Sequence, residues 1–320
     1  MSRRRIIAAG IEHFATVLEP EEAQEPILAP PVREAMLEWL TEIWAEAELQ
    51  AVGIEPRRRA LFKGPPGTGK TTLAHHLAAR LGLPLAILHP ERIIDSWVGA
   101  SAQNLGQVFD ALEAEGAAPH LLFFDEFESL GGKRLQARQG ADLQHNEMVT
   151  TLLARIERYS GYVVAATNRD DELDPAVWRR FDIQVEVALP QQEERRHILA
   201  RYLAPYGLPE PDLQQLAESF ATASPALMRQ FCESLKRQIV IGPKTGRDMR
   251  KEAVVSRILS SVTPHPDLGL PRLWSLKTGD AAIRAMPWPL PLAADLPREA
   301  VAPAPATGGN VVALTGKGKP

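Results

Sequence analysis

The run Gly64-Pro65-Pro66-Gly67-Thr68-Gly69-Lys70-Thr71 is the sequence feature that most constrains the fold of this chain. It matches the pattern G-x-x-x-x-G-K-[ST] and stands between the apolar run 60–62 and a stretch of helical periodicity over 72–81. Glycines let the backbone N–H groups of such a turn converge on phosphate oxygens, and a helix that begins directly after the turn points its positive end at the anion. The run therefore predicts a strand, a loop and a helix that together bind phosphate.

Individual side chains of this run have defined chemical roles. Lys70 can reach the β- and γ-phosphates of a nucleoside triphosphate, and the hydroxyl of Thr71 can ligate Mg²⁺. We expect nine residues to hold the nucleotide: Gly64, Pro65, Pro66, Gly67, Thr68, Gly69, Lys70, Thr71 and Thr72.

A second run, over 121–124, is wholly apolar and ends in two carboxylates, Asp125 and Glu126. Buried strands of a parallel sheet bring such residues to the carboxyl edge of the sheet, where ligands bind in α/β folds. We expect Asp125 to share the Mg²⁺ ion with Thr71, and Glu126 to orient and deprotonate an attacking water. A water nucleophile distinguishes hydrolysis from kinase chemistry, in which a substrate hydroxyl attacks.

The order of apolar runs predicts the fold class. Short runs without polar alternation are typical of strands that are covered on both faces, and here they alternate with helical stretches. These runs lie at 59–62, 85–88, 121–124, 162–166 and 183–187. Helical periodicity alone follows Pro190, over 193–202, 212–220, 226–241 and 247–262. We predict an α/β fold of the P-loop NTPase type, with a doubly wound parallel sheet and a small C-terminal helical lid.

These patterns divide the chain into four segments. We expect an N-terminal helix and linker over 1–30, with the helix over 3–18, and an α/β domain over 31–190. A helical lid over 191–263 and a Pro-rich, partly disordered extension over 264–320 follow. The stretch 274–292 is apolar enough to serve as a docking segment outside the lid.

Composition excludes several classes of protein. The net charge of −4, from 36 basic and 40 acidic residues, argues against a chain that coats nucleic acid or an anionic membrane. The single cysteine, Cys232, rules out a disulfide within the chain. No apolar run approaches the roughly 20 residues that a membrane-spanning helix needs, and Glu12 interrupts the apolar segment near the N-terminus. We expect a soluble, cytoplasmic protein.

Three further segments complete a resemblance to the AAA family of ATPases, which includes katanin, spastin and FtsH. Residues 95–101, Asp-Ser-Trp-Val-Gly-Ala-Ser, resemble the pore loop of that family. Residues 163–169 are similar to its sensor-1 strand, and residues 173–182, which include Arg179 and Arg180, are similar to its arginine-finger segment. Together with the two runs above, five motifs occur in the family's order, and the likeness extends from about Val32 to about Ile241.

The resemblance implies a Mg²⁺-dependent ATPase that works as a homo-oligomeric ring, with six subunits expected. Asn168 can hydrogen-bond the γ-phosphate or the attacking water without adding charge. Arg179 and Arg180 are expected to reach the γ-phosphate in the neighbouring subunit and to stabilise charge in the transition state. The expected catalytic residues are therefore Glu126, Asn168, Arg179 and Arg180.

The pore loop indicates the substrate. In a ring, copies of Trp97 and Val98 would line a central channel and grip a polypeptide, so we expect a protein remodeller or unfoldase. The segment 131–140 resembles a second, basic pore loop. Two alternatives stay open: a nucleic-acid-associated ATPase such as a loader or helicase accessory, although nucleic acid is not the expected partner, and a nucleotide-gated scaffold.

Two departures and one absence complete the reading. The family's glycine-rich entry is replaced by Ile27-Leu28-Ala29-Pro30-Pro31, and residues 223–227 depart from the family pattern at the last helix. We expect Tyr202, Pro225 and Ala226 to surround the adenine. The sequence contains neither a His-Glu-x-x-His nor a Gly-x-Ser-x-Gly protease motif. We therefore expect a separate companion protein, such as a protease, and expect the N-terminal helix to recruit substrate.

Overall fold

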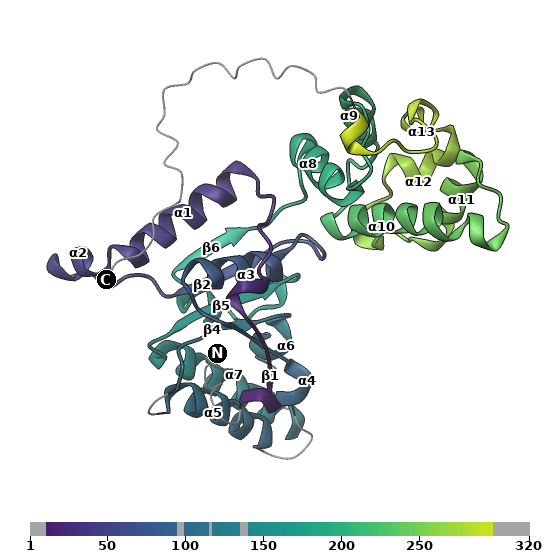
Figure 1. Cartoon of the computed structure of the whole chain (residues 1–320). Helices are drawn as coiled ribbons and strands as arrows, with labels where there is room; N and C mark the ends of the chain where they lie inside the picture. Colours follow the sequence, from purple (N-terminus) through teal and green to yellow (C-terminus); the bar gives the residue numbers. More distant parts are fainter. Residues whose placement is uncertain (1–10, 95–98, 115–116, 135–139, 297–320) are drawn as a thin grey trace.

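The structure, a computed structural model, describes residues 11–94, 99–114, 117–134 and 140–296. Figure 1 shows two parts, an α/β part that contains the sheet and a helical part formed by the chain after β6 (Ile183–Glu186). The candidate site lies at the edge of the sheet that faces the helical part.

The α/β part is built on a six-stranded sheet with the order β1-β3-β4-β5-β2-β6. The other strands are β1 (Ala15–Leu18), β2 (Arg59–Lys63), β3 (Leu85–Leu88), β4 (Leu121–Phe124) and β5 (Tyr162–Thr167). β1 is antiparallel to β3, and all other neighbours are parallel. All four residues of β4 are buried, as in a strand that is covered on both faces.

Helices pack on both faces of the sheet. α1 (Pro30–Trp44) and α3 (Lys70–Arg80) bring Trp39 and Leu73 against Phe62 and Phe123 on one face. α5 (Ala100–Glu113) and α7 (Gly140–Arg158) bury their apolar side chains against Phe124 on the other. The short helices are α2 (Glu46–Ala51), α4 (Pro90–Ile93) and α6 (Glu128–Gly131), and 3-10 turns lie at Ile11–His13, Pro20–Glu22, Asp170–Glu172 and Val177–Arg179. This arrangement confirms the predicted α/β fold.

The helical part has a core of its own. Its helices are α8 (Gln192–Leu203), α9 (Glu210–Ser219), α10 (Pro225–Ile241), α11 (Lys251–Ser261), α12 (Arg272–Leu276) and α13 (Ala281–Ala285). The 3-10 turns here are Pro243–Thr245, Pro266–Leu268, Lys277–Gly279 and Ala293–Asp295. The rings of Phe220, Phe231 and Trp274 meet edge to face in this core, with centroids between 5.3 and 6.2 Å apart.

The stretch 274–292 is not the free docking segment that the sequence suggested. Trp274, Ile283, Met286 and Leu290 are all buried in the core of the helical part. The indole N–H of Trp274 donates to the backbone carbonyl of Val262 at 2.7 Å. That expectation is wrong because the stretch forms short helices, interrupted at 277–280 and followed by three prolines, which hides its periodicity although its apolar side chains fill the core.

The predicted helix over 3–18 is also wrong where the structure describes it. Ala15–Leu18 form strand β1, which pairs with β3 in the register Ala15 to Leu88. Ile11 and Phe14 are buried in the core that α5 and α7 cover. The apolar spacing of this segment suits a helix, but the open edge of β3 supplies hydrogen-bond partners that an isolated helix lacks. These side chains are therefore not available to recruit substrate.

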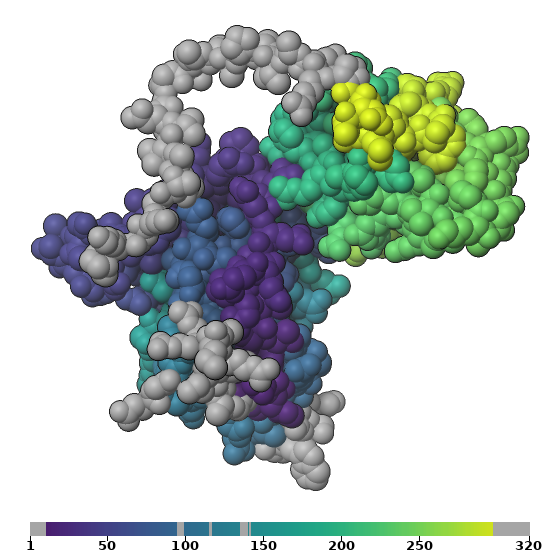
Figure 2. Space-filling model, in the orientation of Figure 1, coloured from purple at the N-terminus to yellow at the C-terminus, as the bar shows by residue number. Residues whose placement is uncertain are grey.

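The linker after β1 runs across α3 to the helical part, as the purple surface in Figure 2 shows. The backbone carbonyl of Glu19 lies 2.9 Å from Nε2 of His75 on α3. Arg201 on α8 donates to the carbonyl of Glu25 at 2.5 Å, and Ile27 packs against the core of the helical part. The linker therefore contacts the α/β part at α3 and the helical part at α8.

Candidate active site

The glycine-rich loop connects β2 to α3, as the sequence predicts. Gly64, Gly67 and Gly69 have φ values of 144°, 73° and 96°, a region that residues with a Cβ rarely adopt. A Cβ on Gly64 would overlap the carbonyl oxygen of Val187, and a Cβ on Gly67 would lie 2.9 Å from Cβ of Ala226. The loop is therefore packed between the end of β6 and the start of α10, and Gly64 and Gly67 are required by space as well as by conformation.

Lys70 lies under this loop with 6% of its surface exposed. Its ammonium donates to the carbonyls of Gly64 at 2.7 Å and Pro65 at 2.9 Å, and to Oδ1 of Asn168 at 2.7 Å. Burial lowers the pKa of Lys70, and the negative charges of Asp125 and Glu128 oppose that effect. Neutral acceptors thus hold the cation, and a phosphate oxygen is a stronger acceptor for the same N–H groups.

Thr71 and Asp125 meet, although 54 residues separate them. The hydroxyl of Thr71 donates to Oδ2 of Asp125 at 3.1 Å, and Oδ1 of Asp125 accepts from the backbone N–H of Glu126 at 3.1 Å. A hydroxyl and a carboxylate are the ligand types that Mg²⁺ accepts beside phosphate oxygens and water. The described residues form no cluster of three or more His, Cys, Asp or Glu side chains that could hold a metal by themselves. The pair fits a Mg²⁺ ion that a nucleotide brings with it.

Glu126 occupies a strained backbone position directly after Asp125. Its φ is +48°, which is uncommon for a residue with a side chain, and its carboxylate is exposed. The next residue, Phe127, donates its N–H to the carbonyl of Ala166 at 2.8 Å and is fully buried, which fixes the turn. The strain therefore presents the carboxylate of Glu126 to the cavity beside the loop.

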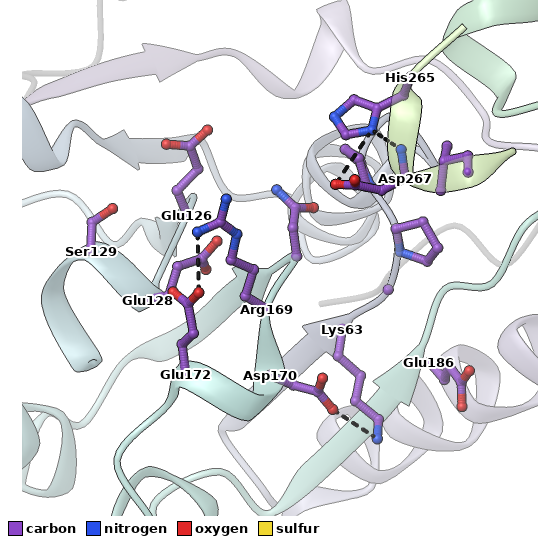
Figure 3. A pocket seen from close by; sticks show the side chains of 15 residues that line it. Lys63, Glu126, Glu128, Ser129, Arg169, Asp170, Glu172, Glu186, His265 and Asp267 are labelled. Atoms are coloured by element: carbon purple, nitrogen blue, oxygen red, sulfur yellow. Dashed lines mark hydrogen bonds and ion pairs between the residues drawn. The ribbon is translucent and has the colours of Figure 1, made fainter. Parts of the chain in front are cut away.

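This cavity has a volume of about 770 Å³ and is strongly charged (Figure 3). Glu126 and Asn168 line it together with the loop residues Gly64, Pro65 and Pro66. Two ion pairs also line it, between Arg169 and Glu172 at 3.1 Å and between Lys63 and Asp170 at 3.5 Å. The charged groups of these two pairs already have partners within the chain.

The helical part closes one side of the cavity, and sequence reasoning missed this contribution. His265, Asp267 and Leu268 line the cavity from the turn after α11. The backbone N–H of Asp267 donates to Nδ1 of His265 at 3.3 Å, so the imidazole caps its own turn. No motif marks these residues, because only the docking of the helical part brings them to the loop.

The start of α10 contacts the loop directly. Ala226 donates its N–H to the carbonyl of Gly67 at 3.2 Å, and the hydroxyl of Ser224 caps the helix at Leu227. Of the three guessed adenine contacts, Pro225 and Ala226 thus lie on a helix end that reaches the loop. Tyr202 instead stacks under the guanidinium of Arg229, with 5.8 Å between that group and the ring centroid.

The two arginines of the predicted finger differ in their surroundings. Arg180 pairs with Glu157 at 3.1 Å, whereas Arg179 is exposed and makes no ion pair with any residue that the structure describes. Phe181, which follows Arg180, is buried and packs edge to face on Phe127, with 5.5 Å between the ring centroids. Neither arginine lines the cavity of its own chain.

The expected pore residues Trp97 and Val98 lie outside the described residues. On the described side before them, Ile93 at the end of α4 is fully buried, and after them Gly99, with a φ of 76°, directly precedes α5. In the second predicted pore loop, Arg134 pairs with Asp174 at 3.4 Å. The carboxylate of Asp174 also accepts from the N–H of Ala176, just before the finger arginines.

Among the described residues, no helix is both long enough and apolar enough to cross a bilayer.

Comparison with known proteins identifies the family. Residues 60–189 match the model of the ATPase family associated with various cellular activities, AAA. The chain is 34% identical over 195 residues to a proteasome-activating nucleotidase of Methanopyrus kandleri, covering 58% of this chain and 44% of that protein. It is 37% identical over 175 residues to an uncharacterized AAA family ATPase of Sinorhizobium fredii, covering 53% and 51%.

A third relative is an ATP-dependent zinc metalloprotease, FtsH 3 of Sphaerobacter thermophilus, with 32% identity over 222 residues. That match covers 67% of this chain and 45% of the relative. The chain therefore spans about half the length of the curated relatives it matches.

Proposed function

Since the chain belongs to the AAA family of ATPases, we propose that it hydrolyses ATP with Mg²⁺, that its sites are shared between the subunits of a ring, and that the ring acts on protein substrates. The observation that carries the proposal is the meeting of Lys70, Asn168, Thr71 and Asp125 at the carboxyl edge of the sheet, beside the exposed carboxylate of Glu126.

Each of these residues has one role in the proposed reaction. Lys70 binds the β- and γ-phosphates in place of its present carbonyl partners, and Thr71 and Asp125 hold Mg²⁺. The ion, when bound, neutralises charge that develops on the phosphate oxygens. Glu126 orients the attacking water and accepts its proton, while Asn168 fixes the position of that water or of the γ-phosphate.

Two variants test the roles of Lys70 and Glu126. Glu126→Gln is expected to bind ATP and to lose turnover by at least about a hundredfold, because general-base catalysis typically contributes that much. Lys70→Ala is expected to lose binding itself. Glu186→Gln is the matched control, since it removes a carboxylate that lines the same cavity on the side away from Glu126 (Figure 3). Full turnover in Glu126→Gln would refute its role as base.

The arginine segment supports a site that two subunits share. Arg179 is an exposed cation that pairs with no other described residue, and it stands outside its own cavity. We propose that Arg179 enters the site of the next subunit, and that Arg180 holds the segment in place through Glu157. The expected assembly is a hexamer. ATP turnover per subunit should then fall when the protein is diluted below the concentration at which it assembles, whereas equal turnover in the monomer would exclude a shared site.

The substrate is proposed from the relatives. One relative is named as an activator of the proteasome and another as a metalloprotease, so both names refer to protein degradation. In addition, Trp97 and Val98 suit a channel that grips a polypeptide. We propose that this chain, which lacks a protease motif, works with a companion protein such as a protease.

An ATPase assay separates protein from nucleic-acid substrates. Unfolded protein is expected to stimulate turnover, and the Trp97→Ala variant should lose that stimulation. Stimulation by single-stranded DNA alone would instead favour the loader or helicase accessory, and stimulation by neither would favour the nucleotide-gated scaffold.

A further inference from the structure

Two exposed apolar patches of opposite charge lie on the molecule outside the nucleotide site. The first, which we call the acidic face, follows the end of α2 and consists of Glu48, Val52, Ile54 and Glu55. Val52 is 70% exposed and Ile54 is 54% exposed. Both glutamates are exposed, and neither forms an ion pair with another described residue. The face therefore combines uncovered apolar surface with unbalanced negative charge.

A shallow groove continues the acidic face between α1 and α2. Its volume is about 540 Å³, and it is lined by Glu38, Thr41, Glu42, Ala45, Leu49 and Ile54. Arg57 pairs with both Glu38 and Glu42, so each carboxylate on the groove wall already has a cationic partner. The groove can thus receive an apolar side chain without leaving a charge unpaired.

The second patch, which we call the basic face, lies at the end of α10 and in the turn after it. It consists of Arg237, Val240, Ile241, Lys244 and Arg247. The first four follow the spacing i, i+3, i+4 and i+7, which places Arg237, Val240 and Ile241 on one side of the helix and continues into the turn. Val240 is 54% exposed and Ile241 is 45% exposed. The three cations form no ion pair with another residue that the structure describes.

The charge around the two faces is strongly unequal for a chain of net charge −4. Residues 34–55 contain six glutamates and no lysine or arginine, and three of these glutamates pair with Arg57 or Arg58. Residues 236–257 contain seven lysines or arginines and two acidic residues, of which Asp248 pairs with Arg250. Surfaces with such complementary charges attract each other and fix the orientation in which they meet. Each face thus offers the chemistry that the other lacks.

The two faces cannot meet within one copy. Figure 1 shows α2 and the α10–α11 end at opposite extremes of the molecule, and Figure 2 shows that α2 projects from the surface. Two different surfaces that bind each other between copies form a head-to-tail interface, which closes into a ring when the rotation allows it. We propose that the acidic face of one copy binds the basic face of the next, an inference that rests on the proposed ring.

This pairing is consistent with a shared nucleotide site. Arg58 links the acidic face to the arginine segment. It pairs with Glu46 of α2 and donates to the carbonyl of Ser160. Ser160 is three residues from Glu157, which is the partner of Arg180. On the other side, α10 runs about 25 Å from Ala226 at the nucleotide loop to the basic face. Each face is thus connected to one half of the proposed shared site, the acidic face to the arginine segment and the basic face to the nucleotide loop.

Charge reversal tests the pairing. The variants Glu48→Lys/Glu55→Lys and Arg237→Glu/Arg247→Glu are each expected to need at least about a tenfold higher concentration to assemble with Mg²⁺ and ATP, because like charges then meet. An equimolar mixture of the two variants should assemble near the wild-type concentration, since each reversed face can then find its complement. Sedimentation velocity measures all three, and rescue in the mixture shows that both variants are folded.

The outcomes separate this inference from the proposed function. Wild-type assembly together with unimpaired assembly of both reversed variants would overturn the pairing and leave the ring intact. A wild-type chain that stays monomeric with Mg²⁺ and ATP would overturn both.

Crosslinking identifies the occupant of each face. The double variant Val52→Cys/Ile241→Cys, treated with a short bis-maleimide, should give a ladder of covalent multimers, and each single variant should stay monomeric. Cys232 does not interfere because it is fully buried and burial raises the pKa of its thiol to about 12. Dimers of Val52→Cys alone would mean that the acidic face binds the same face of another copy. If the cysteine of Val52→Cys reacts with the maleimide only after residues 297–320 are removed, that segment occupies the face. Either result would overturn the proposal.

Discussion

Replacing Trp274 by alanine tests whether the chain after Pro264 belongs to the core of the helical part. Trp274 is 7% exposed, and its ring packs on Phe220 and Phe231. Removal of a buried tryptophan typically costs 3–5 kcal/mol, and the carbonyl of Val262 also loses its donor, so we expect a loss of about 4 kcal/mol in the free energy of unfolding. Trp274→Phe retains much of the packing and should cost about 1–2 kcal/mol.

Urea unfolding measures this effect. With a slope of about 2 kcal/mol per molar urea, the midpoint of the helical part should fall by about 2 M in Trp274→Ala. Trp44→Ala is the matched control, because that tryptophan is 51% exposed and has a guanidinium of Arg80 5.8 Å from its ring centroid, a contact worth about 0.5–1 kcal/mol. Equal midpoints for the two variants would refute the packing argument and restore the free docking segment.

Three further predictions concern the site and its support. Arg179→Ala should reduce ATP turnover by about a thousandfold or more without loss of stability. Arg180→Ala should also lower the melting temperature, because it removes the ion pair with Glu157. Equal melting temperatures for the two variants would contradict these separate roles. Gly64→Ala should abolish ATP binding measured by calorimetry, since its Cβ overlaps Val187, and intact binding would show that the loop can shift.

The third of these predictions is a pH effect. Burial raises the pKa of Glu42, but hydrogen bonds from Arg57 more than offset this and leave the pKa lowered. As the pH falls from the ordinary glutamate pKa of about 4.3 through the lowered value, the free energy of unfolding of the wild type should therefore decrease relative to that of Glu42→Gln. Parallel curves of unfolding free energy against pH for the two proteins would contradict a lowered pKa of Glu42.

The sequence predicted those parts of the site that depend on local order. Asp125 directly follows a wholly apolar strand and Lys70 follows a glycine loop, so the rule that parallel strands present their carboxyl ends at one edge is sufficient to bring the two runs together. The contact between Thr71 and Asp125 follows from that rule, although no pattern gives its distance.

The remaining features depend on partners that are distant in the chain. Ala15–Leu18 form a strand because β3, some seventy residues later, offers a free edge, and no local periodicity contains that information. Trp274 belongs to a core whose last two helices have only five residues each, and His265 reaches the cavity only through the docking of the helical part. Tertiary packing therefore determines the positions of Ala15–Leu18, Trp274 and His265.

The most direct test of a shared site is a mixture of two inactive variants. Glu126→Gln keeps its own Arg179, and Arg179→Ala keeps its own Glu126, so each chain lacks one of the two groups that a complete site needs. In a random equimolar mixture about a quarter of the interfaces join an intact Glu126 to an intact neighbouring Arg179.

We predict that ATP turnover in this mixture recovers to about a quarter of the wild-type rate, although each variant alone is nearly inactive. A mixture that stays as inactive as its components, while sedimentation shows that the two chains assemble together, would contradict the shared site.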